Sequence, residues 1–260
     1  MAANITTGGN QSYDPGEGIR IFQGLKPDIV MIQEFRYKDS SKQDIDDLVS
    51  QAFGPQFKYY REPGNGSKGY INNGVISRWP IIKSGVWDDP YTSNREFTFA
   101  QIDIPGRKDL WAVSVHMLNR GASRRASEAT ELLQYIKNTI PNNDYLAVGG
   151  DFNTITGNET AITKLKPTLD LTAVPTDQQG ESNTNNNRKK HYDWVLPNYD
   201  LSQFHIPVKI GSNTFPSGLV FDSRVFTPIS DVPPIRASDC SPSTMQHMAV
   251  VKDFNVPADE

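Results

Sequence analysis

Short apolar runs recur along the chain, and most of them are bounded by Gly, Pro, Asn or Asp. Runs of this length are typical of β-strands, several of them buried on both faces. A first strand is expected at residues 1–6. The others are expected at residues 29–32, 74–77, 97–104, 110–115, 145–148, 194–196 and 248–251. The chain must therefore build at least one sheet.

Three other segments place apolar residues on one helical face. They span residues 16–25, 41–53 and 123–140. Pro27 and Pro141 stop the first and third segments, while Ser41 and Gly54 bracket the second, with serine as a favoured start signal. Strands mixed with helices predict an α/β or α+β domain. Because we find no internal repeat and no clear linker, we expect one domain over residues 1–260.

The composition is that of a globular chain rather than a disordered one, with 37% hydrophobic and 22% charged residues. The single cysteine, Cys240, excludes an internal disulfide framework and a cysteine-rich zinc site. No apolar run approaches the ~20 residues of a membrane span. The net charge of −4 disfavours tight, sequence-independent binding to nucleic acid. It does not exclude a nuclease, because a metal ion reverses the local sign of a carboxylate cluster.

The chain begins directly on its first expected strand, and no signal peptide is recognisable. We expect that an upstream segment was removed, such as the signal of a secreted protein. The compartment therefore stays open.

Residues 178–190 are low in complexity and have no apolar periodicity, which predicts a loop. The segment ends in Arg188, Lys189 and Lys190, and a strand with chemically suggestive residues follows at once. We therefore interpret it as a substrate-facing loop rather than a merely solvated one.

Polar and ionisable residues recur at the ends of the expected strands. They are Gln33-Glu34, Asn94-Arg95-Glu96, His116, Gly149 to Asn153, Asp193 and His247. One carboxylate or histidine at a strand end is usually structural, but so many together are difficult to explain that way. Rigid strands position catalytic side chains well, and loops give access to them. The set therefore indicates a site.

These residue types favour hydrolysis of a phosphate ester with a hard cation. Carboxylate and amide oxygens suit Mg²⁺, Mn²⁺ or Ca²⁺, whereas four histidines and one cysteine make zinc a poorer choice. The cation would polarise a phosphoryl oxygen and offset developing charge. One histidine could take a proton from water, and the other could donate one to the leaving group. Each histidine needs a carboxylate to fix its tautomer, a role open to Glu96 and Asp193.

The order and spacing of these motifs resemble the endonuclease/exonuclease/phosphatase superfamily, and its deoxyribonuclease I-like branch most of all. The motifs that carry the resemblance are Asn4, Gln33-Glu34, Asn94-Arg95-Glu96, Val115-His116, Gly150 to Asn153, Tyr192-Asp193 and His247. They extend over nearly the whole chain. The resemblance implies an α/β fold, a four-layer sandwich of two packed mixed β-sheets flanked by helices, with the site at one edge.

The resemblance also implies roles for the metal and phosphate ligands. Glu34 would bind the metal, helped by Asn4 and Asp151. Asp151 and Asn153 would position the metal-bound phosphate and the attacking water. The metal would be Mg²⁺, with Mn²⁺ or Ca²⁺ as alternatives.

Two histidines would carry the proton transfers in such a site. His116 would be oriented by Glu96, and His247 by Asp193. Residues expected to contact the substrate phosphate or nucleic acid, each equally explained as an ordinary solvated residue, are Arg36, Asn73, Arg95, Asn119 and Arg124.

One departure from the family pattern concerns the residue before the last histidine. The family usually ends in Ser-Asp-His, whereas here Ser238-Asp239 stands well before Gln246-His247. Either Asp239 loops back to the site or Gln246 replaces the aspartate, and a neutral amide would weaken metal binding. Residues 211–234, which include the polar stretch Phe221 to Arg224, add to this departure.

We therefore predict a monomeric, metal-dependent phosphodiesterase, with nucleic acid as its expected partner and DNA or RNA as its substrate. One alternative is an enzyme that acts on a lipid or small-molecule phosphate ester. A second alternative, motivated by Gln246, is an inactive family member that serves as a binding protein.

Overall fold

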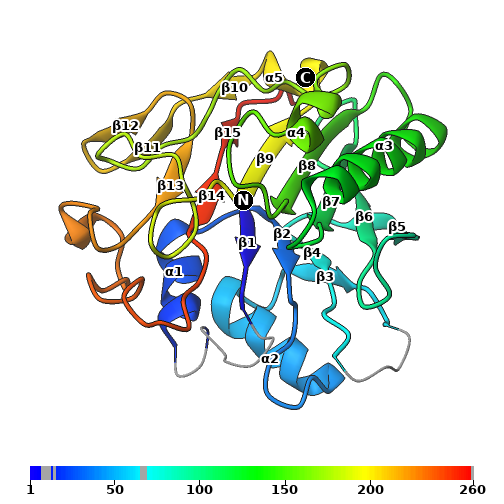
Figure 1. The fold of residues 1–260 in the computed structure, drawn as a ribbon. Helices are drawn as coiled ribbons and strands as arrows, with labels where there is room; N and C mark the ends of the chain where they lie inside the picture. The colour runs from blue at the N-terminus through cyan, green and yellow to red at the C-terminus, as the bar shows by residue number, and fades with distance from the viewer. Residues whose placement is uncertain (7–12, 14–15, 65–68, 259–260) are drawn as a thin grey trace.

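The computed structural model describes residues 1–6, 13, 16–64 and 69–258, and two mixed β-sheets dominate it (Figure 1). The first sheet has six strands in the order β13 (Leu219–Phe221), β14 (Ala249–Val251), β1 (Ala2–Asn4), β2 (Ile29–Gln33), β4 (Gly74–Ser77) and β3 (Lys58–Arg61). The second has five, in the order β5 (Ile81–Trp87), β6 (Phe97–Ile102), β7 (Leu110–His116), β8 (Tyr145–Asp151) and β9 (Asp193–Pro197). Two short ladders pair β10 (His205–Ile206) with β15 (Asp253–Phe254), and β11 (Val208–Ile210) with β12 (Asn213–Phe215).

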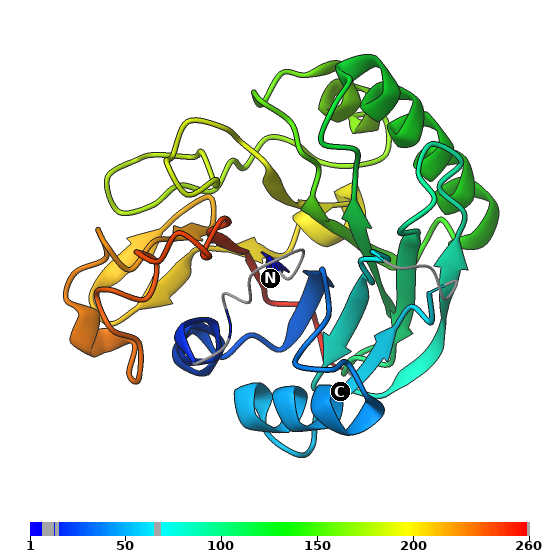
Figure 2. The ribbon, with the colours of Figure 1, turned by 60° about the horizontal axis from the view of Figure 1, so that its bottom comes forward.

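Helices cover the outer face of each sheet, as the view along the layers shows (Figure 2). The helices are α1 (Glu17–Leu25), α2 (Lys42–Phe53), α3 (Ala122–Thr139), α4 (Thr160–Leu165), α5 (Tyr199–Ser202) and the 3₁₀ turn η1 (Ile229–Asp231). One apolar cluster joins α1 and α2 to the six-stranded sheet, and another joins α3 and α4 to the five-stranded sheet. A third cluster fills the space between the sheets. The predicted four-layer α/β sandwich is confirmed.

The strand pattern explains these layers. On β8 every residue is buried, but successive side chains point to opposite faces. Ala147 therefore lies in the core between the sheets, and Val148 lies in the core under α3 and α4. This two-sided burial is the reason why the run reads as continuously apolar in the sequence.

The helix limits follow local chemistry. Ser41 caps α2 through a capping box, in which its side chain accepts from the Asp44 N–H and the Asp44 carboxylate accepts from the Ser41 N–H. α1 ends at Leu25, followed by Lys26 in the left-handed conformation and then by Pro27. The three predicted helices are confirmed to within one residue at each end. Gly16, Ser41 and Ile140, which the prediction included, lie just outside as caps.

Strand direction places the ends of many strands at one edge of the sandwich. β1 runs parallel to β2, and β7 runs parallel to β8, so their carboxyl ends meet there. β9 and β14 are antiparallel to their neighbours and begin at the same edge.

The two sheets approach each other closely beside this edge. Gln33 Nε2 donates to Ser114 Oγ at 2.8 Å, and Ser114 Oγ donates to Ile32 O at 2.9 Å. Gly150 has φ +138°, and a Cβ there would overlap Val115 O and the Gln33 side chain. Only glycine fits this position, which explains the second glycine before Asp151.

Residues 178–190 contain no helix or strand, as predicted, and a single β-bridge in this segment joins Asn185 to His247. In the described part of the chain, no helix is long and apolar enough to span a membrane.

Candidate active site

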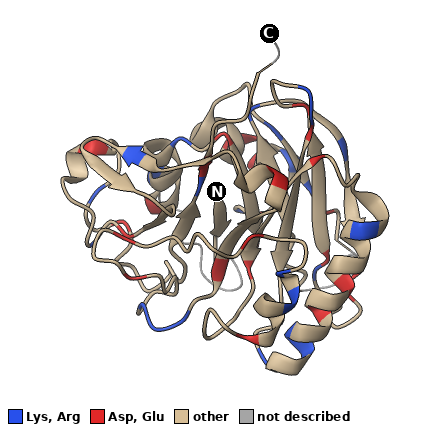
Figure 3. Ribbon diagram, turned by 90° about the horizontal axis from the view of Figure 1, so that it is seen from above, with Lys and Arg blue, Asp and Glu red and all other residues tan. Residues whose placement is uncertain are grey.

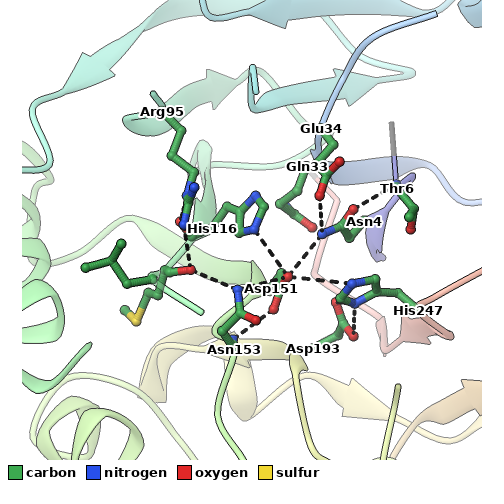
Figure 4. A network of polar contacts seen from close by, with 12 residues as sticks. Asn4, Thr6, Gln33, Glu34, Arg95, His116, Asp151, Asn153, Asp193 and His247 are labelled. Atoms are coloured by element: carbon green, nitrogen blue, oxygen red, sulfur yellow. Dashed lines mark hydrogen bonds and ion pairs between the residues drawn. The ribbon is translucent and has the colours of Figure 1, made fainter. Parts of the chain in front are cut away.

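Six strand ends bring the predicted catalytic and metal-binding residues together at this edge (Figure 4). Asn4 ends β1, Glu34 follows β2, His116 ends β7 and Asp151 ends β8. Asp193 begins β9, and His247 lies just before β14. The first sheet thus contributes the Asn4–Glu34 side, and the second sheet contributes His116 and both aspartates.

Asp151 is the centre of the arrangement. Its Oδ2 lies 3.4 Å from His116 Nε2 and 3.7 Å from His247 Nε2. The same oxygen accepts a hydrogen bond from Asn4 Nδ2 at 3.0 Å, and Oδ1 accepts one from the Asn153 N–H at 2.8 Å. Burial raises the pKa of Asp151 to about 7. The positive charge of His247 acts against this rise, and the negative charge of Asp193 adds to it. The ionised form of this carboxyl is thus disfavoured by burial, and a cation placed beside it would offset that cost.

His247 is held by the predicted carboxylate. Its Nδ1 lies 2.9 Å from Asp193 Oδ2, and Asp193 is fully buried. Burial alone would lower the pKa of His247, but the carboxylates of Asp193 and Asp151 outweigh it and raise the pKa to about 9. His247 is therefore cationic at neutral pH.

Sequence reasoning missed Thr184, which fixes the orientation of Asp193. Its hydroxyl donates to Asp193 Oδ2 at 2.7 Å and accepts from the main-chain N–H groups of Tyr192 and Asp193. Thr184 O also accepts from the Met248 N–H. The low-complexity loop therefore supports the His247 segment, a role that its composition does not signal.

His116 has the opposite electrostatic environment. Burial, and then the positive charges of Arg95 and His247, holds its pKa well below the usual range. Its Nδ1 is buried and has no hydrogen-bond partner among the described residues. The two histidines thus offer one neutral and one cationic imidazole, which is how paired titratable groups divide acid and base roles.

The structure does not bring Glu96 into hydrogen-bond contact with His116. Glu96 is half-buried, and within the described ranges no hydrogen bond of its carboxylate is found. Instead, the main chain of His116 is held by Arg95, whose Nε donates to His116 O at 2.5 Å and whose Nη2 donates to Met117 O at 3.0 Å. Asn153 Nδ2 also donates to Met117 O, at 2.9 Å.

The carboxylate oxygens of Glu34 and Asp151 fit a hard cation, and the Asn4 side chain lies between them. Asn4 Nδ2 lies 3.4 Å from Glu34 Oε1 and 3.0 Å from Asp151 Oδ2, so an amide N–H₂ bridges two carboxylates. Asn4 Oδ1 accepts from the Thr6 N–H, which fixes this orientation of the amide. A divalent cation would supply far more positive charge between the same oxygens, which are the ligand types that Mg²⁺ prefers.

A second group of ligand atoms overlaps this one. Asp151, Asp193 and His247 each offer an atom, and these atoms lie within 4.8 Å of one another. Here, however, Asp193 engages His247 Nδ1 at hydrogen-bond distance, which is the arrangement of an oriented acid–base histidine. We therefore favour the Asn4–Glu34–Asp151 side for the cation.

Two site residues have backbone conformations that non-glycine residues rarely adopt. Glu34 has φ +54° and Asn153 has φ +52°. Such conformations are costly and cluster at functional sites, where the surrounding structure holds them. Neighbouring bonds do so here, since Phe35 N–H donates to Asn72 O and Asn153 N–H donates to Asp151.

The predicted phosphate contacts are spread over different environments. Asn119 and Arg124 are exposed on the loop after β7 and the first turn of α3, and Arg36 is half-buried after β2. Asn73 is fully buried and donates from Nδ2 to Glu96 O at 2.7 Å, while its Oδ1 has no partner among the described residues. Arg95 is buried and bonded to main-chain carbonyls, so its guanidinium supports the histidine rather than facing solvent.

The residue before His247 brings no carboxylate to the site. Asp239 is fully buried and accepts two hydrogen bonds from Arg20, at 3.0 and 2.6 Å, so it does not loop back. Gln246 occupies the position and is exposed. Asp222 and Arg224, in the polar stretch after β13, pair with each other, and Asp222 also pairs with Arg188, at 2.8 Å.

A sequence profile of the Endonuclease/Exonuclease/phosphatase family matches residues 15–235. No curated protein sequence gave a match. Solved structures with the same fold include the endonuclease/exonuclease/phosphatase of Bacteroides vulgatus, at 19% identity and TM-score 0.58, covering 76% of this chain and 85% of that one. The Beutenbergia cavernae endonuclease/exonuclease/phosphatase has 15% identity and TM-score 0.63, covering 96% of this chain and 69% of that one. Staphylococcus aureus beta toxin has 15% identity and TM-score 0.57, covering 82% of this chain and 93% of that one.

The family's members are generally hydrolases of phosphate esters. Its sequence profile spans most of the chain, and the fold agrees with it. This protein belongs to the endonuclease/exonuclease/phosphatase family.

Proposed function

We propose that the protein is a metal-dependent phosphodiesterase that hydrolyses DNA or RNA. The observation that carries the proposal is the pair of histidines on one oxygen of Asp151, at 3.4 and 3.7 Å, next to the Asn4–Glu34 ligand side. A bound cation would stabilise negative charge on the phosphoryl oxygen. Glu34 and Asp151 would hold it there, and Asn4 would become a ligand on turning its Oδ1 from the Thr6 N–H toward the ion.

The protonation states of the histidines assign their roles in this proposal. His116 is neutral and takes the proton from the attacking water, and His247 is cationic and protonates the leaving oxygen. Asp193 stabilises the charged His247, and Arg95 and Asn153 hold the His116 segment. Each such proton transfer by a positioned side chain typically raises the reaction rate about 10²–10⁴-fold.

A nucleic acid substrate is supported by the cationic groups beside His247. The Tyr192 ring lies 5.6 Å from the His247 ring, and Lys190 Nζ lies 3.1 Å from Tyr192 Oη. Lys189 is exposed one residue away. The chain as a whole has a net charge of −4, and acidic and basic residues are interspersed along the ribbon in Figure 3. Local rather than global charge would therefore attract the polyanion.

The test is a hydrolysis screen with Mg²⁺, Mn²⁺ and Ca²⁺ against supercoiled plasmid, single-stranded RNA, sphingomyelin and bis-p-nitrophenyl phosphate. EDTA and the His247→Ala protein serve as controls. Plasmid or RNA cleavage that needs both metal and His247 is the expected result. Cleavage of lipid or of the small ester alone would replace the nuclease with the other class of phosphodiesterase. Metal binding without any hydrolysis would favour a binding protein.

A further inference from the structure

A cavity of about 420 Å³ lies next to the candidate active site, on the other face of β9. Asp193 and Trp194 are consecutive on that strand, so their side chains point to opposite faces, Asp193 to the site and Trp194 to the cavity. Ile155 lines the cavity two residues after Asn153 of the site. The cavity and the candidate site therefore share the segment that follows β8 and the beginning of β9.

One wall of the cavity is aromatic and preformed. His191 stacks on Trp194 with ring centroids 3.8 Å apart and an interplanar angle of 18°. Trp194 Nε1 donates to Thr154 Oγ1 at 3.0 Å, and Thr154 Oγ1 donates to His191 O at 2.5 Å. Burial lowers the pKa of His191 to about 4, so this wall is uncharged at neutral pH.

The mouth combines exposed aliphatic side chains with polar groups. Ile155 is 53% exposed and Val174 is 37% exposed, which is unusual for residues of their size in this chain. Ser182, Asn183 and Lys189 also line the cavity, and Lys189 is exposed. A ligand would meet apolar surface inside and hydrogen-bonding groups with a positive charge at the edge.

We propose that this cavity binds a nucleobase of the substrate, close along the strand to the phosphate that is cleaved. A base is flat and apolar on its faces and polar on its edges, and it is joined to a phosphate that Lys189 can pair with. An acyl chain would use the apolar walls but would leave the Ser182 hydroxyl and the Lys189 charge at the mouth unused, whereas Asn183 Nδ2 already donates to Arg188 O at 3.4 Å. The inference rests on the proposed nuclease function.

The experiment compares p-nitrophenyl esters of a thymidine dinucleotide with esters in which hydrogen replaces one base or the other. Release of p-nitrophenol is measured, and it reports cleavage of the bond to the p-nitrophenyl group alone. Removal of one of the two bases is expected to raise KM about tenfold, because stacking of a base on a protein ring contributes about 1–3 kcal/mol. An octyl p-nitrophenyl phosphate is the apolar comparison.

Ile155→Asp should abolish the KM advantage of that base and leave hydrolysis of the ester that lacks it unchanged. Ile82→Asp is the matched control, because Ile82 is 54% exposed on β5, outside the cavity. Equal KM values for all dinucleotide esters in the wild-type protein would overturn the base subsite and leave the phosphodiesterase function intact. The same conclusion would follow if an octyl group lowered KM as much as the thymine base does. No hydrolysis of any ester would instead overturn the proposed function itself.

Discussion

At the residue scale, His116 and His247 carry the same side chain in opposite surroundings. Asp193 raises the pKa of His247 against the effect of burial, whereas burial and Arg95 lower that of His116. In the proposed mechanism both act on one reaction, but only the contribution of the acid depends on how poor the leaving group is. This difference can be measured.

We expect His247→Ala to lose about 10² or more in kcat on a nucleotide ester but much less on a p-nitrophenyl ester, whose leaving group needs no proton. His116→Ala should lose a similar factor on both, because the water must be deprotonated in either case. The measurement is the loss of kcat of each variant on the nucleotide ester, divided by its loss on the p-nitrophenyl ester. If the p-nitrophenyl ester instead restored the activity of His116→Ala, the acid and base assignments would be reversed.

Arg95 has the positive charge expected of a phosphate contact, but its hydrogen bonds go to the main chain. Its guanidinium donates to the carbonyls of His116 and Met117, so it acts on the reaction through the position of the imidazole. Arg95→Met should lower kcat with little change in KM, and Arg95→Lys should recover part of the loss. Arg78→Met is the control, because Arg78 is an exposed arginine after β4, next to the start of β2 rather than to its end at the site. A rise in KM with kcat unchanged would instead make Arg95 a phosphate contact.

At the element scale, Glu62 joins the two sheets just after β3. Its buried carboxylate accepts from the Asn73 N–H at 2.7 Å in the first sheet, and from the Glu96 N–H at 3.2 Å and Thr98 Oγ1 at 3.1 Å beside β6. Burial raises its pKa from 4.5 to about 8 despite these bonds. The folded state therefore holds the Glu62 proton more tightly than the unfolded chain does.

For a carboxyl group with a raised pKa, stability is greatest below the unfolded pKa and falls as pH rises toward the folded value. The free energy of unfolding should therefore decline between about pH 4.5 and about pH 8, and Glu62→Gln should flatten that decline. Urea unfolding in EDTA across this range tests it, with Glu131→Gln on α3 as the control. The same slope in Glu62→Gln and wild type would contradict the prediction.

At the scale of the whole molecule, the proposed cation joins the two sheets. Glu34 belongs to the first sheet, and Asp151 belongs to the second. Mg²⁺ should therefore stabilise the entire sandwich, by about 2.7 kcal/mol at a hundred times its Kd. Thermal unfolding against metal concentration should show this rise in midpoint, and Glu34→Gln should require more metal for the same rise. Identical titrations for both proteins would remove Glu34 from the metal site.

The regular elements could be predicted because their cause is local. β8 is a short apolar run, and α2 has a serine cap and one apolar face, both of which are visible in the sequence. The elements that were not predicted are β3, β5, β10 to β13, β15, α4, α5 and η1. All but β5 have two to six residues, too few for a period to emerge, and β5 is partly exposed with Lys83, Ser84 and Gly85 between its apolar residues. The strands β10, β13 and β15 pair with partners that are distant in the chain, whereas β11 and β12 form a local hairpin.

The candidate site shows the same division. The sequence by itself determined the family motifs and their order, because each metal or proton-transfer residue ends or begins a strand and its chemical type limits what it can do. Only the tertiary structure decided that Asp239 pairs with Arg20, that Thr184 holds Asp193, and that Arg95 faces the main chain. Hydrogen bonds between segments far apart in the chain depend on the packing of both sheets, and no local pattern encodes that packing.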